Sequence, residues 1–109
     1  MAVIETSDQQ LIFDLLEYKR VILKFHNDAC GKVCQELKIV YEELSEEKAY
    51  KGITFLRLNG DDNPIAKKYL EEKKQPIMNI YLDGVLIECR TVGSRQLIEK
   101  LLDKLLKAN

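Results

Sequence analysis

Two cysteines of the sequence, Cys30 and Cys34, stand four positions apart in the stretch HNDACGKVCQELK. Thiols this close along a chain can carry out thiol–disulfide exchange, in which one thiolate attacks a disulfide and the second thiol completes the exchange. The third cysteine, Cys89, makes the total odd, which is not the pattern of a disulfide-stapled secreted domain. The spacing therefore favours a redox-active or metal-binding pair over a structural disulfide.

The exchange chemistry requires a thiolate at Cys30, and several nearby groups can favour that charge. We expect Cys30 to lie at or just before a helix N-terminus, whose unpaired N–H groups lower the pKa of a thiol. Lys24, Arg57 and, when protonated, His26 would lower it further if their side chains project toward the pair. The alternative for Lys24 is that its ammonium group reaches solvent or pairs with a glutamate.

Three intervening residues limit how the two cysteines can form a disulfide. A disulfide needs Cβ atoms about 3.5–4.5 Å apart, whereas residues four apart in a regular helix have Cβ atoms about 5–6 Å apart. The pair can close only if Cys30 and Gly31 lie in a loop before the helix, and glycine adopts the backbone angles of such a loop readily. The sequence therefore allows a Cys30–Cys34 disulfide and predicts that the helix begins near Lys32.

A metal centre is a further interpretation of the same residues. Cys30, Cys34 and His26 supply at most three ligands, and their spacing does not match a zinc signature. An iron–sulfur cluster needs four ligands, and the chain has three cysteines. We therefore predict no metal and no cofactor.

Hydrophobic periodicity and turn residues predict the elements that must position the pair. Helical spacing of apolar residues predicts helices over 7–18, 32–51, 63–74 and 94–105. Short apolar runs predict strands over 2–5, 21–26, 53–58, 77–82 and 85–92, the first of them at a sheet edge. Ser7 with Gln10 resembles a capping box, Asn63 and Ser94 are predicted N-caps, and Asp83-Gly84 predicts a hairpin turn.

This order of elements predicts one α/β domain. Alternating strands and helices followed by an antiparallel hairpin favour a single mixed sheet of about five strands with helices on both faces. The chain of 109 residues is long enough for one core and contains no linker or repeat, so we assign residues 1–109 to a single domain.

Composition excludes several classes of partner. The 17 basic and 18 acidic residues give a formal net charge of -1 and form no block of one sign. We therefore expect no nucleic-acid and no membrane partner. The N-terminal residues lack the pattern of a secretory signal, and no apolar run approaches the length of a membrane span. If the chain is complete, we expect a cytoplasmic protein, and we expect a monomer.

Four segments of the chain, in order and at near-family spacing, resemble the thioredoxin family. These are VILKF before the paired cysteines, ACGKVC itself, LNGDDNPIAKKY, and QPIMNIYLDGVLIECRTVG, which ends in a Val-Gly pair. The resemblance covers nearly the whole chain and implies the thioredoxin fold. It also implies disulfide oxidoreductase activity, with Cys30 as nucleophile and Cys34 as resolving cysteine. Protein disulfides would be the substrates, and a reductase or another thiol donor would restore the dithiol.

The resemblance also implies where a substrate peptide binds. Pro76 matches the family's cis-proline beside the cysteines, and Gln75 before it presents backbone to an extended peptide. Gly93 leaves room for the same groove, and Ala29 precedes the nucleophile. From the residues alone, Pro76 is equally consistent with a proline that ends a helix and begins a strand.

Departures from the family pattern leave a second function open. Ala29 and His26 replace two tryptophans, and the proline between the cysteines is absent. Lys24 stands in place of a buried aspartate, and Arg57 in place of a lysine. The alternative function is therefore a thioredoxin-fold binding module with little or no redox turnover. Cys89, on the last predicted strand, is expected to be a buried free thiol that packs as a small hydrophobic residue, with redox sensing or dimer linkage as the alternative.

Overall fold

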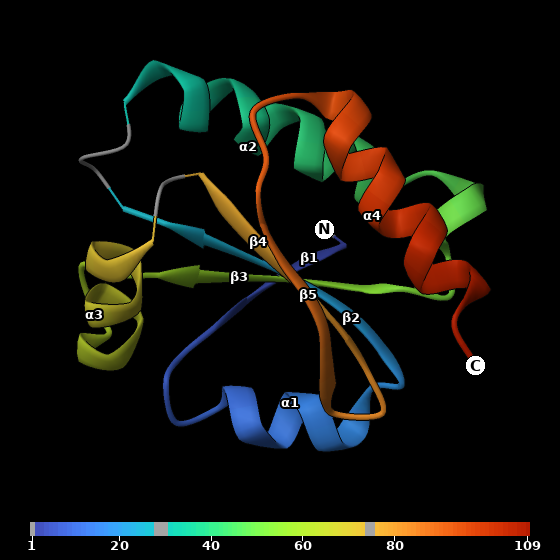
Figure 1. Cartoon of the computed structure of the whole chain (residues 1–109), viewed down its shortest axis with the longest axis horizontal. Helices are drawn as coiled ribbons and strands as arrows, with labels where there is room; N and C mark the ends of the chain where they lie inside the picture. The colour runs from blue at the N-terminus through green and yellow to red at the C-terminus, as the bar shows by residue number, and fades with distance from the viewer. Residues whose placement is uncertain (1, 28–30, 74–75) are drawn as a thin grey trace.

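The computed structural model describes residues 2–27, 31–73 and 76–109. Figure 1 shows a central twisted sheet with helices above and below it. The strands are β1 (Val3–Thr6), β2 (Arg20–His26), β3 (Thr54–Asn59), β4 (Ile77–Leu82) and β5 (Val85–Thr91). The helices are α1 (Leu11–Glu17), α2 (Lys32–Ser45), α3 (Pro64–Glu72) and α4 (Arg95–Lys107), with a short 3₁₀ helix, η2 (Lys48–Tyr50).

The sheet is mixed, as the element order predicts. Its strand order is β1-β3-β2-β4-β5. β1 and β2 both pair with β3 in parallel, whereas β4 runs antiparallel to β2 and to β5. β1 lies at the edge, as predicted. β2 is the central strand and has five of its seven residues buried, as is usual for a strand covered on both faces, and β3 beside it has three of its six residues buried.

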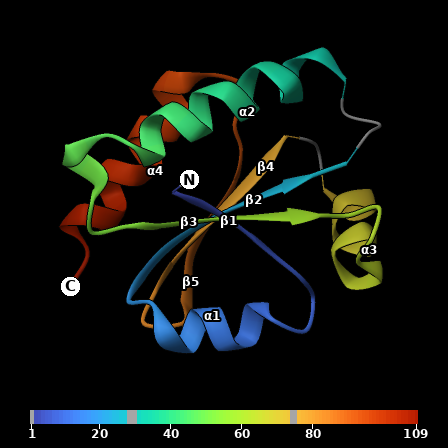
Figure 2. The same cartoon turned by 180° about the vertical axis from the view of Figure 1, so that it is seen from behind.

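Two hydrophobic clusters separate the faces of the sheet. α2 and α4 cover one face of the sheet, where they pack against strand residues such as Ile22 and Met78. α1 and α3 pack on the other face against Val21, Leu23 and Phe25. Figure 2, seen from behind, shows the same division. Because side chains alternate along a strand, Lys24 of β2 shares its face with Ile22 and therefore lies beneath α2.

Several local predictions are confirmed. Asp83 and Gly84 have φ angles of 51° and 81°, as a tight turn between β4 and β5 requires. The Ser94 hydroxyl accepts a hydrogen bond from the Leu97 N–H at 3.3 Å and caps α4. The prediction for α2 was too long at its C-terminal end, because the helix stops at Ser45 and the chain continues into η2, which buries Tyr50.

The N-terminus of α3 is capped from a distant part of the chain. Asn63 occupies the N-cap position as predicted, but its side chain makes no capping bond and instead accepts from the Asp8 N–H and donates to the Asn59 carbonyl. The Asp8 carboxylate accepts hydrogen bonds from the N–H groups of Ile65 at 2.8 Å and Ala66 at 3.1 Å. Asp8 thus joins the segment before α1 to α3.

Replacing Asp8 by alanine is expected to lower the free energy of unfolding by about 1–2 kcal/mol, since two N–H groups and the helix dipole lose their carboxylate. Urea unfolding followed by circular dichroism measures the change. Asp8→Asn, which keeps an acceptor oxygen, should lose less. Equal stability of Asp8→Ala and the wild type would show that the cap contributes nothing.

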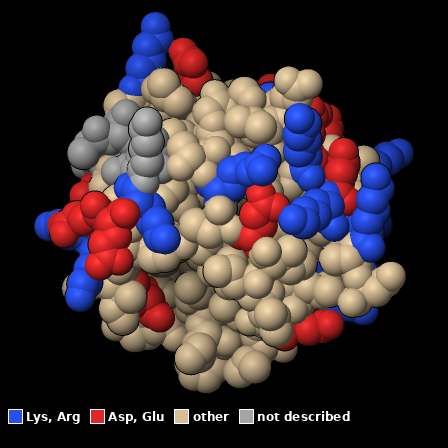
Figure 3. Space-filling model, viewed as in Figure 1, with Lys and Arg blue, Asp and Glu red and all other residues tan. Residues whose placement is uncertain are grey.

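Surface charge agrees with the composition. Figure 3 shows basic and acidic side chains interspersed, with an uncharged area over the part of this face where Figure 1 places α1. No helix within the described ranges is both long and apolar enough to cross a membrane.

Candidate functional site

The site predicted from the paired cysteines lies where β2 ends and α2 begins. Cys34 is in the first turn of α2 and is 7% exposed. It lies on the buried face of the helix, which continues through Leu37, Tyr41 and Leu44. Of the other predicted site residues, Cys30, Ala29 and Gln75 lie outside the described residues.

Gly31 forms the junction between loop and helix. It is the N-cap residue of α2, with φ 81° and ψ -149°, and its carbonyl accepts the N–H of Gln35 at 3.2 Å. This left-handed conformation is one that residues with a Cβ rarely adopt. The prediction that Gly31 lies before the helix, which begins at Lys32, is therefore confirmed. Cys34 lies inside the helix.

A polar cavity of about 460 Å³ opens beside Cys34, and we call it the Lys24 pocket. The structure here brings together three of the predicted residues, Lys24, His26 and Cys34. The lining residues are Lys24, His26, Asn27, Gly31, Cys34, Gln35 and Lys38. Gln35 and Lys38 were not predicted; both are exposed residues of α2, and Lys38 lies about one helical turn after Cys34.

Lys24 is buried, with 2% of its surface exposed. Its ammonium nitrogen lies 5.9 Å from the centre of the Tyr41 ring. Burial, together with the positive charges of Arg57 and Lys38, lowers the pKa of Lys24 from 10.5 to about 8. Within the described part of the chain it makes no ion pair, so neither alternative for Lys24, solvent exposure or a glutamate partner, is observed.

Arg57 is adjacent to Lys24 but its charge is neutralised. The two residues are paired across β2 and β3. The Arg57 guanidinium lies 2.7 Å from a Glu5 carboxylate oxygen and 3.5 Å from one of Glu42. These two glutamates were missed from sequence because they come from β1 and from the middle of α2, distant along the chain. Arg57 therefore acts on the site mainly by lowering the pKa of Lys24.

His26 is largely neutral at pH 7. Burial and the charge of Lys24 lower its pKa below 6.5, against the opposing effect of Glu5 at 3.7 Å. Its Nε2 atom is buried and has no hydrogen-bond partner among the described residues. The positive potential near Cys34 therefore comes from Lys24 and Lys38 more than from His26.

Pro76 and Gly93 lie at the same end of the sheet as Cys34, but beyond β2. The β2–β4 register pairs Lys24 with Met78, and continuing it by two residues places Pro76 opposite His26. The Pro76 carbonyl accepts the N–H of Val92 at 2.9 Å, which holds Gly93 beside it. No other described atom lies within 4 Å of where a Cβ on Gly93 would be. Neither residue lines the Lys24 pocket, whose lining comes from the end of β2 and the start of α2.

Cys89 lies on the opposite face of the sheet from Cys34. It is free, as predicted, but half-buried rather than fully buried. Its sulfur lies 2.9 Å from the Tyr69 hydroxyl, and burial together with this contact raises the pKa of Tyr69 to about 12. As predicted, Cys89 packs against a hydrophobic cluster, and the contact with the Tyr69 hydroxyl from α3 is an addition that the sequence did not indicate.

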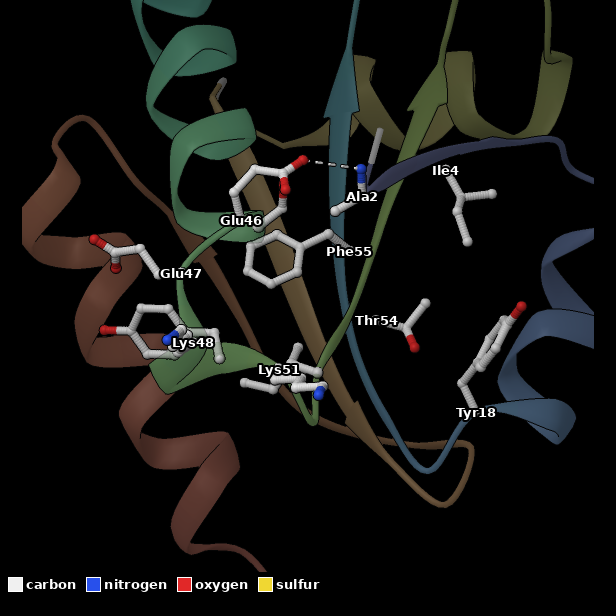
Figure 4. Close-up of a pocket in the computed structure, with 12 residues that line it drawn as sticks. Ala2, Ile4, Tyr18, Glu46, Glu47, Lys48, Lys51, Thr54 and Phe55 are labelled. Carbon is white, nitrogen blue, oxygen red and sulfur yellow. Dashed lines mark hydrogen bonds between the residues drawn. The ribbon is translucent and has the colours of Figure 1, made fainter.

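A pocket of about 500 Å³ lies at the other end of the molecule, among the residues that Figure 4 shows. Its walls come from β1, the C-terminal end of α2, η2 and β3, and Glu46 there accepts a hydrogen bond from the Ala2 N–H. Since α2 has 14 residues and rises about 1.5 Å per residue, this pocket is roughly 20 Å from Cys34. It has no part in chemistry at the cysteine.

Metal ligands are not gathered at either place. No group of three or more His, Cys, Asp or Glu side chains within residues 2–27, 31–73 and 76–109 is arranged to hold a metal ion.

Comparisons with known proteins agree on one family. The family model described as Thioredoxin matches residues 2–107. A thioredoxin of Ictalurus punctatus is 29% identical over 70 residues, which are 64% of each chain. A thioredoxin of Malassezia sympodialis superposes with a TM-score of 0.82 at 17% identity, over 96% of this chain and 94% of that one. For a Plasmodium falciparum thioredoxin the TM-score is 0.80 at 20% identity, with coverage of 95% and 98%.

Proposed function

Because the chain belongs to the thioredoxin family, we propose that it is a thiol–disulfide oxidoreductase with Cys30 as nucleophile and Cys34 as resolving cysteine. The observation that carries the proposal is the position of Cys34, nearly buried in the first turn of α2 directly after the Gly31 loop. A sulfur placed there is shielded from a bulky protein substrate yet is within reach of a partner in the preceding loop. A resolving cysteine needs both properties.

The reaction proceeds by two exchanges. The Cys30 thiolate attacks one sulfur of a substrate disulfide, which forms a mixed disulfide and releases the first substrate thiolate to be protonated by solvent. The Cys34 thiolate then attacks the Cys30 sulfur, which closes the Cys30–Cys34 disulfide and releases the second substrate thiolate. Two electrons pass from the protein dithiol to the substrate. A reductase or another thiol donor returns them and restores the dithiol.

Lys24 tunes the resolving thiol. Its pKa of about 8 leaves it mostly protonated at pH 7, so in the reduced protein its positive charge stabilises negative charge that develops on the Cys34 sulfur across the pocket that both line. This electrostatic effect has the opposite sign to that of the buried aspartate that the family has here. Arg57 and His26 contribute less, since Arg57 is paired with two glutamates and His26 is largely neutral.

The substrate peptide is assigned to the other side of the cysteines. Gly93 has open space where a side chain would be, Pro76 lies beside it before β4, and Ala29 and Gln75 complete the groove in the proposal. We propose that the protein works as a cytoplasmic monomer on protein disulfides, without a cofactor.

A redox titration tests the proposal. The protein is equilibrated in glutathione or dithiothreitol buffers, alkylated, and analysed by mass spectrometry. We expect a reversible loss of two hydrogens mapped to a peptide that links Cys30 and Cys34. If both thiols stay free under oxidants that close ordinary dithiols, the three-residue loop is inactive. The second candidate function, a binding module with little or no redox turnover, would then replace the first. The absence of the two tryptophans and of the loop proline favours that alternative.

A further inference from the structure

The Lys24 pocket has an excess of positive charge. Lys24 and Lys38 line it, and its described lining includes no aspartate or glutamate. The N-terminus of α2 also faces it through Gly31 and Cys34. The N-cap residue of that helix is Gly31, no described side chain caps it, and its first turn contains no acidic residue. Its first N–H groups and its dipole are therefore not compensated by a carboxylate from the helix itself.

Lys24 provides an independent sign that this pocket accepts an anion. A buried ammonium group is normally paired, because isolating the charge from water is costly. Lys24 is 2% exposed, yet no hydrogen bond or ion pair forms on it within the described ranges. The acids that influence it, Glu42 and Glu5, both pair with Arg57 instead.

His26, whose Nε2 atom lies 3.7 Å from a Glu5 carboxylate oxygen, also lines the Lys24 pocket. Its buried Nε2 lies in this pocket region without a hydrogen-bond partner in the part of the chain that the structure describes. Burial and the Lys24 charge lower its pKa, which a nearby anion would reverse. Lys24, Lys38, His26 and the N-terminus of α2 thus line one pocket, and the charged side chains in its described lining are basic.

We propose that the Lys24 pocket binds a small oxyanion, such as phosphate or sulfate, either free or as the terminal group of a small molecule. Oxygen atoms of the anion accept hydrogen bonds from the Lys24 ammonium and from first-turn N–H groups of α2. The volume of about 460 Å³ is larger than one tetrahedral oxyanion, so an organic substituent also fits. The site does not require Cys30 and Cys34 to cycle.

The ring signals of His26, the only histidine of the chain, report on the pocket by NMR. Sodium sulfate is titrated into the full chain at constant ionic strength, with sodium chloride as the reference. We expect saturable shifts of the His26 resonances and a higher His26 pKa in sulfate than in chloride. Shifts that are unsaturable, or equal in chloride, would overturn the proposal, because they reflect screening alone.

Matched variants assign the binding to this pocket. Lys24→Met should weaken sulfate binding by about tenfold or more, since a charge-assisted hydrogen bond is lost. Lys38→Met should weaken it less. Lys68→Met makes the same change of net charge on the exposed side of α3 and should bind as the wild type does. Unchanged affinity in both Lys24→Met and Lys38→Met would place the anion elsewhere and overturn the proposal.

A phosphomonoester distinguishes the two sources of the anion. Glycerol phosphate and inorganic phosphate are titrated side by side into the wild type and Lys24→Met. Tighter binding of the ester identifies the terminal group of a small molecule, whereas tighter or equal binding of phosphate identifies the free ion. If the wild type binds either compound and Lys24→Met does not, the result supports binding in the Lys24 pocket.

Discussion

Replacing Cys30 by serine is expected to reduce the rate of insulin disulfide reduction by about 100-fold or more, to the level of the uncatalysed reaction with dithiothreitol. A serine hydroxyl is not ionised at pH 7 and is a poor nucleophile toward sulfur without a base. Cys34→Ser should also stop turnover, but at a later step. The Cys30 thiolate would still attack, and the mixed disulfide would persist because no second thiol resolves it.

The two cysteine variants are separated by mass spectrometry of protein trapped with a disulfide substrate. Cys34→Ser should accumulate a covalent complex that Cys30→Ser does not form. Cys89→Ser is the control, because Cys89 lies on the opposite face of the sheet from Cys34 and should leave the rate unchanged. Wild-type activity in Cys30→Ser, or loss of activity in Cys89→Ser, would contradict the assignment of the nucleophile.

Replacing Lys24 by methionine is expected to raise the free energy of unfolding by about 2–3 kcal/mol at pH 7. The pKa of Lys24 falls from 10.5 in the unfolded chain to about 8 in the folded protein. Each pKa unit corresponds to about 1.4 kcal/mol, and water that reaches the pocket reduces the full value. Methionine fills a similar volume without the charge.

The stability difference between Lys24→Met and the wild type should depend on pH, because Lys24 titrates at different pH values in the folded and unfolded states. Below pH 8 both states hold the proton, so the wild type carries the full cost of the buried ammonium. Between pH 8 and 10.5 the folded state releases the proton while the unfolded state keeps it, so the cost falls as pH rises. The stability gap between Lys24→Met and the wild type should therefore be largest at pH 7 and small at pH 10.5.

Urea unfolding under reducing conditions at pH 7 and above pH 10 measures the two gaps. Lys68→Met serves as the control, since its exposed side chain should give no gap at either pH. A less stable Lys24→Met at pH 7 would mean that the ammonium makes a stabilising contact. A gap that does not change with pH would mean that methionine acts through packing alone.

Local sequence was sufficient for the elements around the site. The apolar run of β2, the helical spacing of α2 and the turn at Asp83-Gly84 depend on residues close together in the chain. Gly31 was predictable for the same reason, because the loop before α2 needs a residue that tolerates a positive φ. The order of these elements was also enough to predict the mixed sheet and its two covered faces.

The charges at the site were decided by tertiary structure alone. Sequence placed Lys24, Arg57 and His26 near the cysteines as three similar cations, but folding gives them different states. Arg57 meets Glu5 from β1 and Glu42 from α2, whereas Lys24 is enclosed beneath Tyr41 and pairs with no acid among the described residues.

Two other contacts were equally invisible in the sequence. Asp8 caps α3 from 57 residues away, and Tyr69 brings its hydroxyl to Cys89 from another element. Protonation, capping and pocket formation depend on which side chains meet after the chain has packed. Local periodicity does not predict these side-chain contacts, because the partners are distant in sequence and become neighbours only when the sheet assembles.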